Sequence, residues 1–197
     1  MKGEEIQFLS RQDIKSMQET AMAETLTYVN THSTYYRELF AKEKIDYSKI
    51  KRLEDLQQIP VTTKQQLQVR DQDFLCVHPT QVLDYVTTSG TLGVPVTFAV
   101  TKSDLERLAL SEYLSYAFCG CTNTDILQLM VTNDRCFMAG LACLLGSFKL
   151  HSGIIRVGNG IPELQWSTIN RIHPTVCVCV PSFILKLIEF AEAHGID

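Results

Sequence analysis

The sequence predicts an α/β protein in which a helical N-terminal region precedes a largely parallel sheet with flanking helices. In the first 80 residues, apolar side chains such as Ile14, Met17 and Leu26 recur at helical spacing. After Pro79, short β-rich runs begin, and from residue 126 they alternate with helical patterns. Such alternation is typical of a parallel sheet covered by helices. Hydrophobic residues make up 45% of the 197 positions, which is enough for a sizeable core.

The helical region is expected over residues 1–80. Residues 13–30 form an amphipathic pattern, with apolar side chains on one half of the helical wheel and polar ones on the other. Residues 32–50 are expected to form a second short helix and a loop. Thr62 and Thr63 then precede a helical pattern, which predicts a threonine-capped helix start.

The α/β region, residues 81–197, begins with two β-rich runs, 82–86 and 94–100, around a loop. Ser103 and Glu106 predict a capping box for a helix that ends near Gly120. Further strands are expected at 126–131, 154–157 and 176–180, alternating with helices at 137–148, 163–172 and 182–194. The last helix ends at Gly195 with no closing element, so we expect residues 1–197 to be a single truncated domain.

Charge and hydropathy exclude several classes of partner. The chain has 18 Lys and Arg against 22 Asp and Glu, a net charge of −4, so it lacks the basic surface that binds nucleic acid or anionic lipid. Its most apolar stretch, residues 136–148, is well short of the ~20 residues of a membrane helix. The N-terminus has no apolar secretory leader, so a cytoplasmic location is expected.

The seven cysteines are expected to be reduced thiols, and no metal site is predicted. Neither C-x-C pair has the spacing of a structural zinc site. Cys177 and Cys179 alternate with valines, which places both thiols on one face of a strand as small buried side chains.

The segment Thr87–Gly93 gathers four hydroxyls and two glycines in seven residues between the two β-rich runs. Glycines allow backbone N–H groups to converge on an anion, and hydroxyls add donors, so the loop suits phosphate. The same composition is also typical of an ordinary turn. The loop lacks the Gly-Lys-Ser/Thr ending of a Walker motif and the glycine of a nucleophile elbow.

The loop Thr87-Thr88-Ser89-Gly90-Thr91-Leu92-Gly93-Val94-Pro95 resembles the phosphate loop of the adenylate-forming, or acyl-CoA synthetase, superfamily. Leu92 and Val94 depart from it, standing where a hydroxyl residue and a lysine are common. Residues 59–67, Ile-Pro-Val-Thr-Thr-Lys-Gln-Gln-Leu, resemble the segment ahead of this loop in phenylacetate–CoA ligases. The series Gly158-Asn159-Gly160, Pro174-Thr175 and Pro181-Ser182-Phe183 also resembles theirs, in the same order.

The resemblance implies an ATP-dependent ligase that joins an aromatic carboxylate, phenylacetate, to coenzyme A with Mg²⁺, releasing AMP and pyrophosphate. It also implies that the chain is the front part of the acyl-CoA synthetase N-terminal domain, because the family's adenine, ribose and magnesium motifs, and its C-terminal lysine domain, are not found in it. The 197 residues alone are therefore expected to be inactive, with no confident catalytic residue. The implied ATP-phosphate site comprises Thr88, Ser89, Gly90, Thr91 and Gly93, and the implied acyl pocket comprises Phe137, Met138, Ala139 and Gly140.

Two alternatives remain open at this point. The chain could belong to an adenylating enzyme whose acceptor is not coenzyme A, or it could be a non-catalytic assembly module. An interrupted parallel sheet leaves an unpaired edge and an uncovered apolar face, which predicts a homo-oligomer. For residues 137–141, core packing of a buried helix is the competing interpretation.

Overall fold

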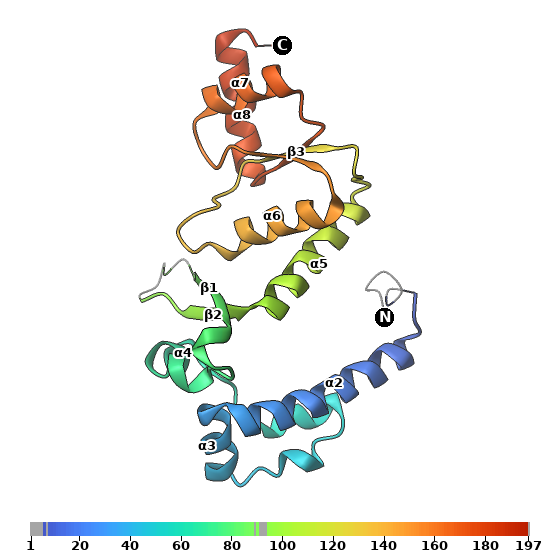
Figure 1. The fold of residues 1–197 in the computed structure, drawn as a ribbon, viewed down its shortest axis with the longest axis vertical. Coiled ribbons are helices and arrows are strands. Elements are labelled where there is room, and N and C mark those ends of the chain that lie inside the picture. The colour runs from blue at the N-terminus through green and yellow to red at the C-terminus, as the bar shows by residue number, and fades with distance from the viewer. Residues whose placement is uncertain (1–5, 7, 89, 91–93, 197) are drawn as a thin grey trace. The chain divides into compact units, whose positions relative to one another are not determined.

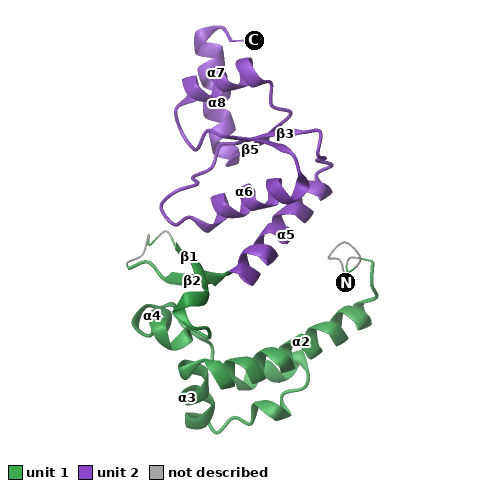
Figure 2. Ribbon diagram, viewed as in Figure 1, with its two compact units in different colours: residues 1–101 green, residues 102–197 purple. Residues whose placement is uncertain are grey.

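A computed structural model describes residues 6, 8–88, 90 and 94–196 of the chain. The chain forms two compact units, residues 1–101 and 102–197, which Figure 2 shows in different colours. The predicted single domain over 1–197 stays a prediction. Within the described ranges, no helix is long and apolar enough to cross a membrane.

The first unit is built on two consecutive helices, α2 (Arg11–His32) and α3 (Thr34–Lys42), seen in blue in Figure 1. Ser33 lies between them and caps α3, because its hydroxyl accepts a hydrogen bond from the Tyr36 N–H. The predicted amphipathic helix and the short helix after it are thereby confirmed. Their apolar sides meet in a core of Met22 and Leu26 of α2 and Phe40 of α3, which Ile50 completes from the segment after α3.

Short elements lead from this core to a hairpin. They are the 3₁₀ turns η1 (Tyr47–Lys49), η2 (Leu53–Gln58), η3 (Asp71–Phe74) and η4 (Pro79–Gln81), with the helix α4 (Lys64–Val69) between η2 and η3. The predicted threonine cap is confirmed, since Thr63 and Gln66 form a capping box at the start of α4. The strands β1 (Val82–Thr87) and β2 (Thr97–Thr101) follow and pair antiparallel.

The second unit alternates helices and strands, as predicted. In chain order it contains α5 (Lys102–Phe118), β3 (Ile126–Leu129), α6 (Met138–Leu150), β4 (Gly153–Arg156), α7 (Pro162–Ile172), β5 (Val176–Val178) and α8 (Pro181–His194). Both strand pairs are parallel, and β3 lies between β4 and β5.

The helices of this unit cover opposite faces of the sheet. Leu127 and Leu129 of β3 point to one face and pack with Cys143 and Leu150 of α6 and with Tyr116 of α5. Successive residues of a strand point to opposite faces, so Gln128 faces the other side, where it contacts α7. In Figure 1, α7 and α8 accordingly lie on the far side of β3 from α5 and α6.

Two sequence predictions are wrong in detail. The predicted capping box at Ser103 does not form the helix start, because α5 already begins at Lys102; Glu106 instead lies 3.8 Å from the Lys102 ammonium. Cys177 is exposed and Cys179 is only partly buried, although both were predicted to be buried. The flanking valines Val176 and Val178 are the side chains that pack on the core.

Asp125 ties the amino ends of two neighbouring strands together. Its carboxylate accepts hydrogen bonds from the Thr122 N–H at 2.7 Å and the Thr175 hydroxyl at 2.8 Å. The Thr175 hydroxyl oxygen in turn accepts from the Ile126 N–H at 3.0 Å. These bonds, that of the Thr122 N–H first, hold the pKa of Asp125 below its ordinary value.

We therefore expect the stabilisation from Asp125 to be present at neutral pH and to disappear as pH falls below about 4, through its lowered folded-state pKa. Thermal unfolding measured across this range should show a steeper loss of stability in the wild type than in Asp125→Asn. Parallel pH profiles for the two proteins would contradict this role. Asp134→Asn, on an exposed carboxylate, is the matched control.

Candidate functional site

The loop predicted to bind phosphate connects the two strands of the β1–β2 hairpin. Thr88 closes its neck: its N–H donates to the Val96 carbonyl, and its hydroxyl oxygen accepts from the Val96 N–H, both at 3.0 Å. Val96 is only 2% exposed, so the neck is anchored in the interior. Thr88 and Val96, which flank the segment predicted to bind phosphate, are thus bonded to each other at the end of the two strands.

The structure describes two of the five residues predicted to hold phosphate. The Thr88 hydroxyl uses its oxygen to close the neck, which leaves its proton available as a donor. Gly90 has a φ of 67°, in the left-handed region that glycine adopts without strain. Ser89, Thr91 and Gly93 lie outside the described residues, so the phosphate site stays a prediction.

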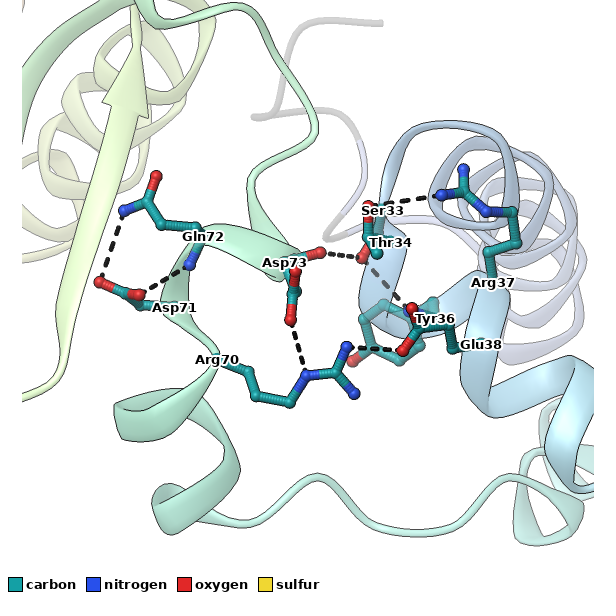
Figure 3. Close-up of polar contacts among 9 residues, drawn as sticks. All are labelled: Ser33, Thr34, Tyr36, Arg37, Glu38, Arg70, Asp71, Gln72 and Asp73. Carbon is teal, nitrogen blue, oxygen red and sulfur yellow. Dashed lines mark hydrogen bonds and ion pairs between the residues drawn. The ribbon is translucent and has the colours of Figure 1, made fainter.

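A series of polar contacts links Val94, at the C-terminal side of this loop, to α4 and then to α3 and η3. The Gln68 amide of α4 donates to the carbonyl oxygen of Val94. At the end of α4, Arg70 binds Glu38 of α3 and Asp73 of η3, each at 2.6 Å, as Figure 3 shows. These two carboxylates, Glu38 first, raise the pKa of the Arg70 guanidinium.

Aromatic and backbone contacts also join the end of α4, α3 and η3 around Arg70. The Arg70 guanidinium lies 5.3 Å from the ring centroid of Tyr35, which also stacks on Phe74 at 4.1 Å. The Ser33 hydroxyl donates to the Asp73 carbonyl at 2.8 Å (Figure 3). The helical part of the first unit therefore contacts the end of α4, and Gln68 of α4 contacts Val94. Sequence analysis missed Gln68 and Arg70, because neither stands in a recognisable motif for this contact.

A second candidate site lies at the carboxyl edge of the parallel sheet, within residues 102–197. The chain leaves β3 toward α6 on one face and leaves β4 toward α7 on the other face. Such a divergence of connections is where open α/β sheets bind ligands. The two exits stay close, since the Gly158 N–H donates to the Leu129 carbonyl at 3.1 Å. We use the name β3–β4 crevice for the edge of the sheet at which residues 130–138 leave β3 and residues 157–161 leave β4.

Both walls of the β3–β4 crevice contain backbone in the left-handed region. Arg135 and Cys136 both have φ of 56°, directly before Phe137, the N-cap of α6. On the other wall, Ile161 has φ of 49° directly before α7. A β-branched side chain is strained in this region, and such strain is often retained at binding sites.

The residues predicted to line the acyl pocket lie at this edge. Phe137, Met138 and Ala139 are exposed, so they do not follow the competing core-packing interpretation. Gly140 is buried, and a Cβ atom built on it would lie 1.8 Å from the Thr132 carbonyl oxygen. Gly140 thus allows α6 to approach the backbone of Thr132 and Asn133, in the segment between β3 and α6, closely. The predicted role of all four residues as an acyl pocket stays a prediction.

The cysteine thiols offer no activated nucleophile on the α7 face. Partial desolvation by the surrounding protein raises the pKa of Cys179 and, although Cys177 is exposed, also that of Cys177, so these thiols stay protonated at neutral pH. Among the described residues, no group of three or more His, Cys, Asp and Glu side chains could hold a metal ion.

No family model matches the chain. It is 28% identical over 194 residues to the phenylacetate-coenzyme A ligase of Thermus thermophilus, covering 98% of this chain and 43% of that protein. It is 27% identical over 190 residues to the phenylacetate-coenzyme A ligase of Escherichia coli, covering 95% of this chain and 43% of that protein. The chain therefore spans less than half the length of these relatives.

Solved structures share the fold. A crystal structure of 2-hydroxyisobutyryl-CoA ligase, in complex with 2-HIB-AMP and CoA, superposes with a TM-score of 0.86 at 21% identity, covering 95% of this chain and 41% of that one. An open conformation of the same ligase gives a TM-score of 0.84 at 20% identity, covering 95% of this chain and 45% of that one. The predicted fold class is confirmed by this agreement.

Proposed function

We propose, from the premise that the chain corresponds to the N-terminal part of the phenylacetate-coenzyme A ligases, that residues 1–197 supply the phosphate loop and the acid-binding wall of an ATP-dependent acid–thiol ligase. The observation that carries the proposal is the match to these relatives along 95–98% of the chain. The pair of hydrogen bonds between Thr88 and Val96 supports it, because it joins the residues on either side of the segment that resembles the family's phosphate loop.

The reaction proposed for the whole enzyme has two steps. A carboxylate oxygen of phenylacetate attacks the α-phosphorus of ATP, and the bond to pyrophosphate breaks. The sulfur of coenzyme A then attacks the acyl carbonyl, the thiol proton is lost, and the bond to AMP breaks. The loop at residues 88–93 stabilises the phosphate charge with N–H and hydroxyl donors, without becoming covalently bound.

Mg²⁺ would assist the departure of pyrophosphate in such a ligase. The described residues contain no cluster of ligands that fits a metal ion, so we assign no residue of this chain to it. We also propose that residues 1–197 by themselves form no acyl-CoA. Groups that bind adenine and ribose, and a lid that excludes water, would be missing from them.

A chimaeric enzyme tests the proposal. Residues 1–197 are joined to the part of the Thermus thermophilus ligase that lies beyond the matched segment, and ATP–pyrophosphate exchange is measured with and without phenylacetate. Exchange that depends on phenylacetate supports the proposal, and a folded chimaera without exchange contradicts it. Exchange that is normal but yields no thioester with coenzyme A would favour the alternative of a different acyl acceptor.

The acyl pocket makes a specific prediction at Ala139, which is exposed at the start of α6. Ala139→Leu adds bulk to the wall of the β3–β4 crevice, so the chimaera should lose about tenfold in kcat/KM for phenylacetate relative to acetate. Phe148→Leu is the control, because Phe148 is exposed near the opposite end of the same helix. An unchanged preference in the Ala139 variant would remove this residue from the pocket.

We further propose that the chain self-associates. Exposed apolar side chains occur on α8, where Leu185 is 61% and Ile188 is 47% exposed, and just before it at Val180. Burial of such side chains against a second copy is favourable. Light scattering at micromolar concentration should give at least a dimer, and Leu185→Lys with Ile188→Glu should restore the monomer. A monodisperse wild-type monomer would contradict self-association.

A further inference from the structure

A buried pair of glutamines lies beneath one wall of the β3–β4 crevice. Gln128 of β3 and Gln165 of α7 both have no solvent exposure. The Gln128 Nε2 donates to the Gln165 Oε1 at 2.8 Å and to the Gln165 backbone carbonyl at 3.3 Å. The Gln165 Nε2 donates to the carbonyl oxygens of Gly158 at 2.9 Å and of Gly160 at 3.2 Å.

The hydrogen bonds fix the orientation of both carboxamides. Gln165 has two carbonyl oxygens on one side, so only its NH₂ group can face them, and its Oε1 must face Gln128. Gln128 must then present its NH₂ group to that oxygen. The carbonyls of Gly158 and Gly160 therefore decide which group of each glutamine is the donor and which is the acceptor.

The pair is not arranged for maximum stability. The Gln128 Oε1 is buried and has no hydrogen-bond partner among the described residues. A buried acceptor without a donor is costly, and a pair of apolar side chains would avoid that cost. The two glutamines instead hold a surface loop in place through the Gln165 side chain.

What it holds is the loop Gly158-Asn159-Gly160. Both glycines have left-handed φ, 80° and 78°, and a Cβ on either would meet no described atom within 4 Å. The loop is therefore open on one side and attached on the other, by its two carbonyls, to Gln165. Asn159, between them, is exposed at the carboxyl edge of the sheet.

We infer that Gln165 is a positioning residue for the acid substrate. By binding the carbonyls of Gly158 and Gly160, it sets the position of the loop that lies beside the carboxyl end of β3, where the Gly158 N–H donates to the Leu129 carbonyl. With the loop it sets the position of the exposed Asn159, against which we place the bound acid. This inference rests on the proposed function, since that function places the acid in the crevice. Gln165 itself touches neither the acid nor the reacting atoms.

The first arm of the test needs only the 197-residue chain. Gln165→Met keeps the length of the side chain but removes both donors. Hydrogen exchange is compared at two amides: Gly158 N–H, which is bonded to Leu129, and Met130 N–H, which is bonded to Val178 on the other side of β3. Release of the loop should raise the exchange rate of Gly158 relative to Met130 roughly tenfold, the effect of losing a hydrogen bond or two.

Thr168→Val is the matched control on the same helix. Thr168 is 3% exposed, and its hydroxyl donates only to the Leu164 carbonyl of α7, at 2.8 Å. Both variants lose buried hydrogen bonds of α7, but only Gln165→Met releases the loop. A general loss of stability would raise exchange at Gly158 and Met130 together. An unchanged ratio in Gln165→Met, or an equal change in Thr168→Val, overturns the inference.

The second arm uses the active chimaera. Gln165→Met should raise KM for phenylacetate about tenfold while leaving KM for ATP within about twofold, and Thr168→Val should change neither. A released loop with unchanged KM for phenylacetate overturns the assignment to the acid. If the unmutated chimaera lacks exchange activity, the proposed function fails and with it the role toward the acid, while the first arm still decides whether Gln165 positions the loop.

Discussion

We expect Gly140→Ala to destabilise the 102–197 unit by about 3 kcal/mol, because the new methyl group would collide with backbone and not with a movable side chain. A Cβ at this position lies 1.8 Å from the Thr132 carbonyl oxygen and 2.8 Å from the Thr132 carbonyl carbon. In an unobstructed helix the same substitution stabilises by up to about 1 kcal/mol, through helix propensity. A lower free energy of unfolding would therefore indicate that α6 packs closely against Thr132, whereas a higher one would indicate an unobstructed helix.

Urea unfolding monitored by circular dichroism measures this change. Ala139→Leu, at the neighbouring exposed position, is the control and should stay within about 0.5 kcal/mol of the wild type. Gly140→Ala with wild-type or higher stability would show that α6 does not approach residues 131–133 as described. The same collision means that a large residue at Gly140 is no clean probe of substrate choice, which is why Ala139 serves that purpose.

Ser89→Ala with Thr91→Val should slow adenylation more than any other change to the loop that leaves its neck intact. Each substitution removes a hydroxyl that donates to a charged phosphate, a bond of roughly 1.5–3 kcal/mol. Together they should reduce phenylacetate-dependent pyrophosphate exchange in the chimaera by about 10²- to 10⁴-fold. Wild-type exchange rates in the double variant would show that the loop is an ordinary turn.

Thr101→Val is a suitable control for this pair, because Thr101 is a hydroxyl residue of the same hairpin at the far end of β2. It should leave exchange within about twofold of the unmutated chimaera. A loss as large in this control as in the double variant would attribute the effect to the hairpin as a whole and not to phosphate contacts.

Local signals predicted most of the elements. The end of α5 is an example: the Cys121 N–H bonds the Tyr116 carbonyl and the Gly120 N–H bonds the Ala117 carbonyl, as expected for a glycine-terminated helix. The predicted cap at Ser103 failed because α5 begins at Lys102, immediately after β2, so this serine already lies inside the first turn. Capping patterns locate a helix start only to within a residue or two.

Features that depend on segments distant in sequence could not be predicted. Alternation placed Cys177 and Cys179 on one face of a strand, but it does not tell what covers that face, and Cys177 is exposed. Gln68, Arg70 and Gln165 act through carbonyls or carboxylates that are 3 to 32 residues away. A carbonyl is present at every position, so no sequence pattern marks the partner.

The most direct test of the central claim, that the hairpin loop binds the phosphates of ATP, is an NMR titration of the ¹⁵N-labelled chain with inorganic pyrophosphate. We predict saturable amide shifts confined to residues 88–96, with affinity on the order of 1 mM because only part of the ATP site is present. The shifts should disappear in the Ser89→Ala, Thr91→Val variant. Shifts that are absent, or that scatter over surface lysines and arginines and persist in the variant, would contradict the claim.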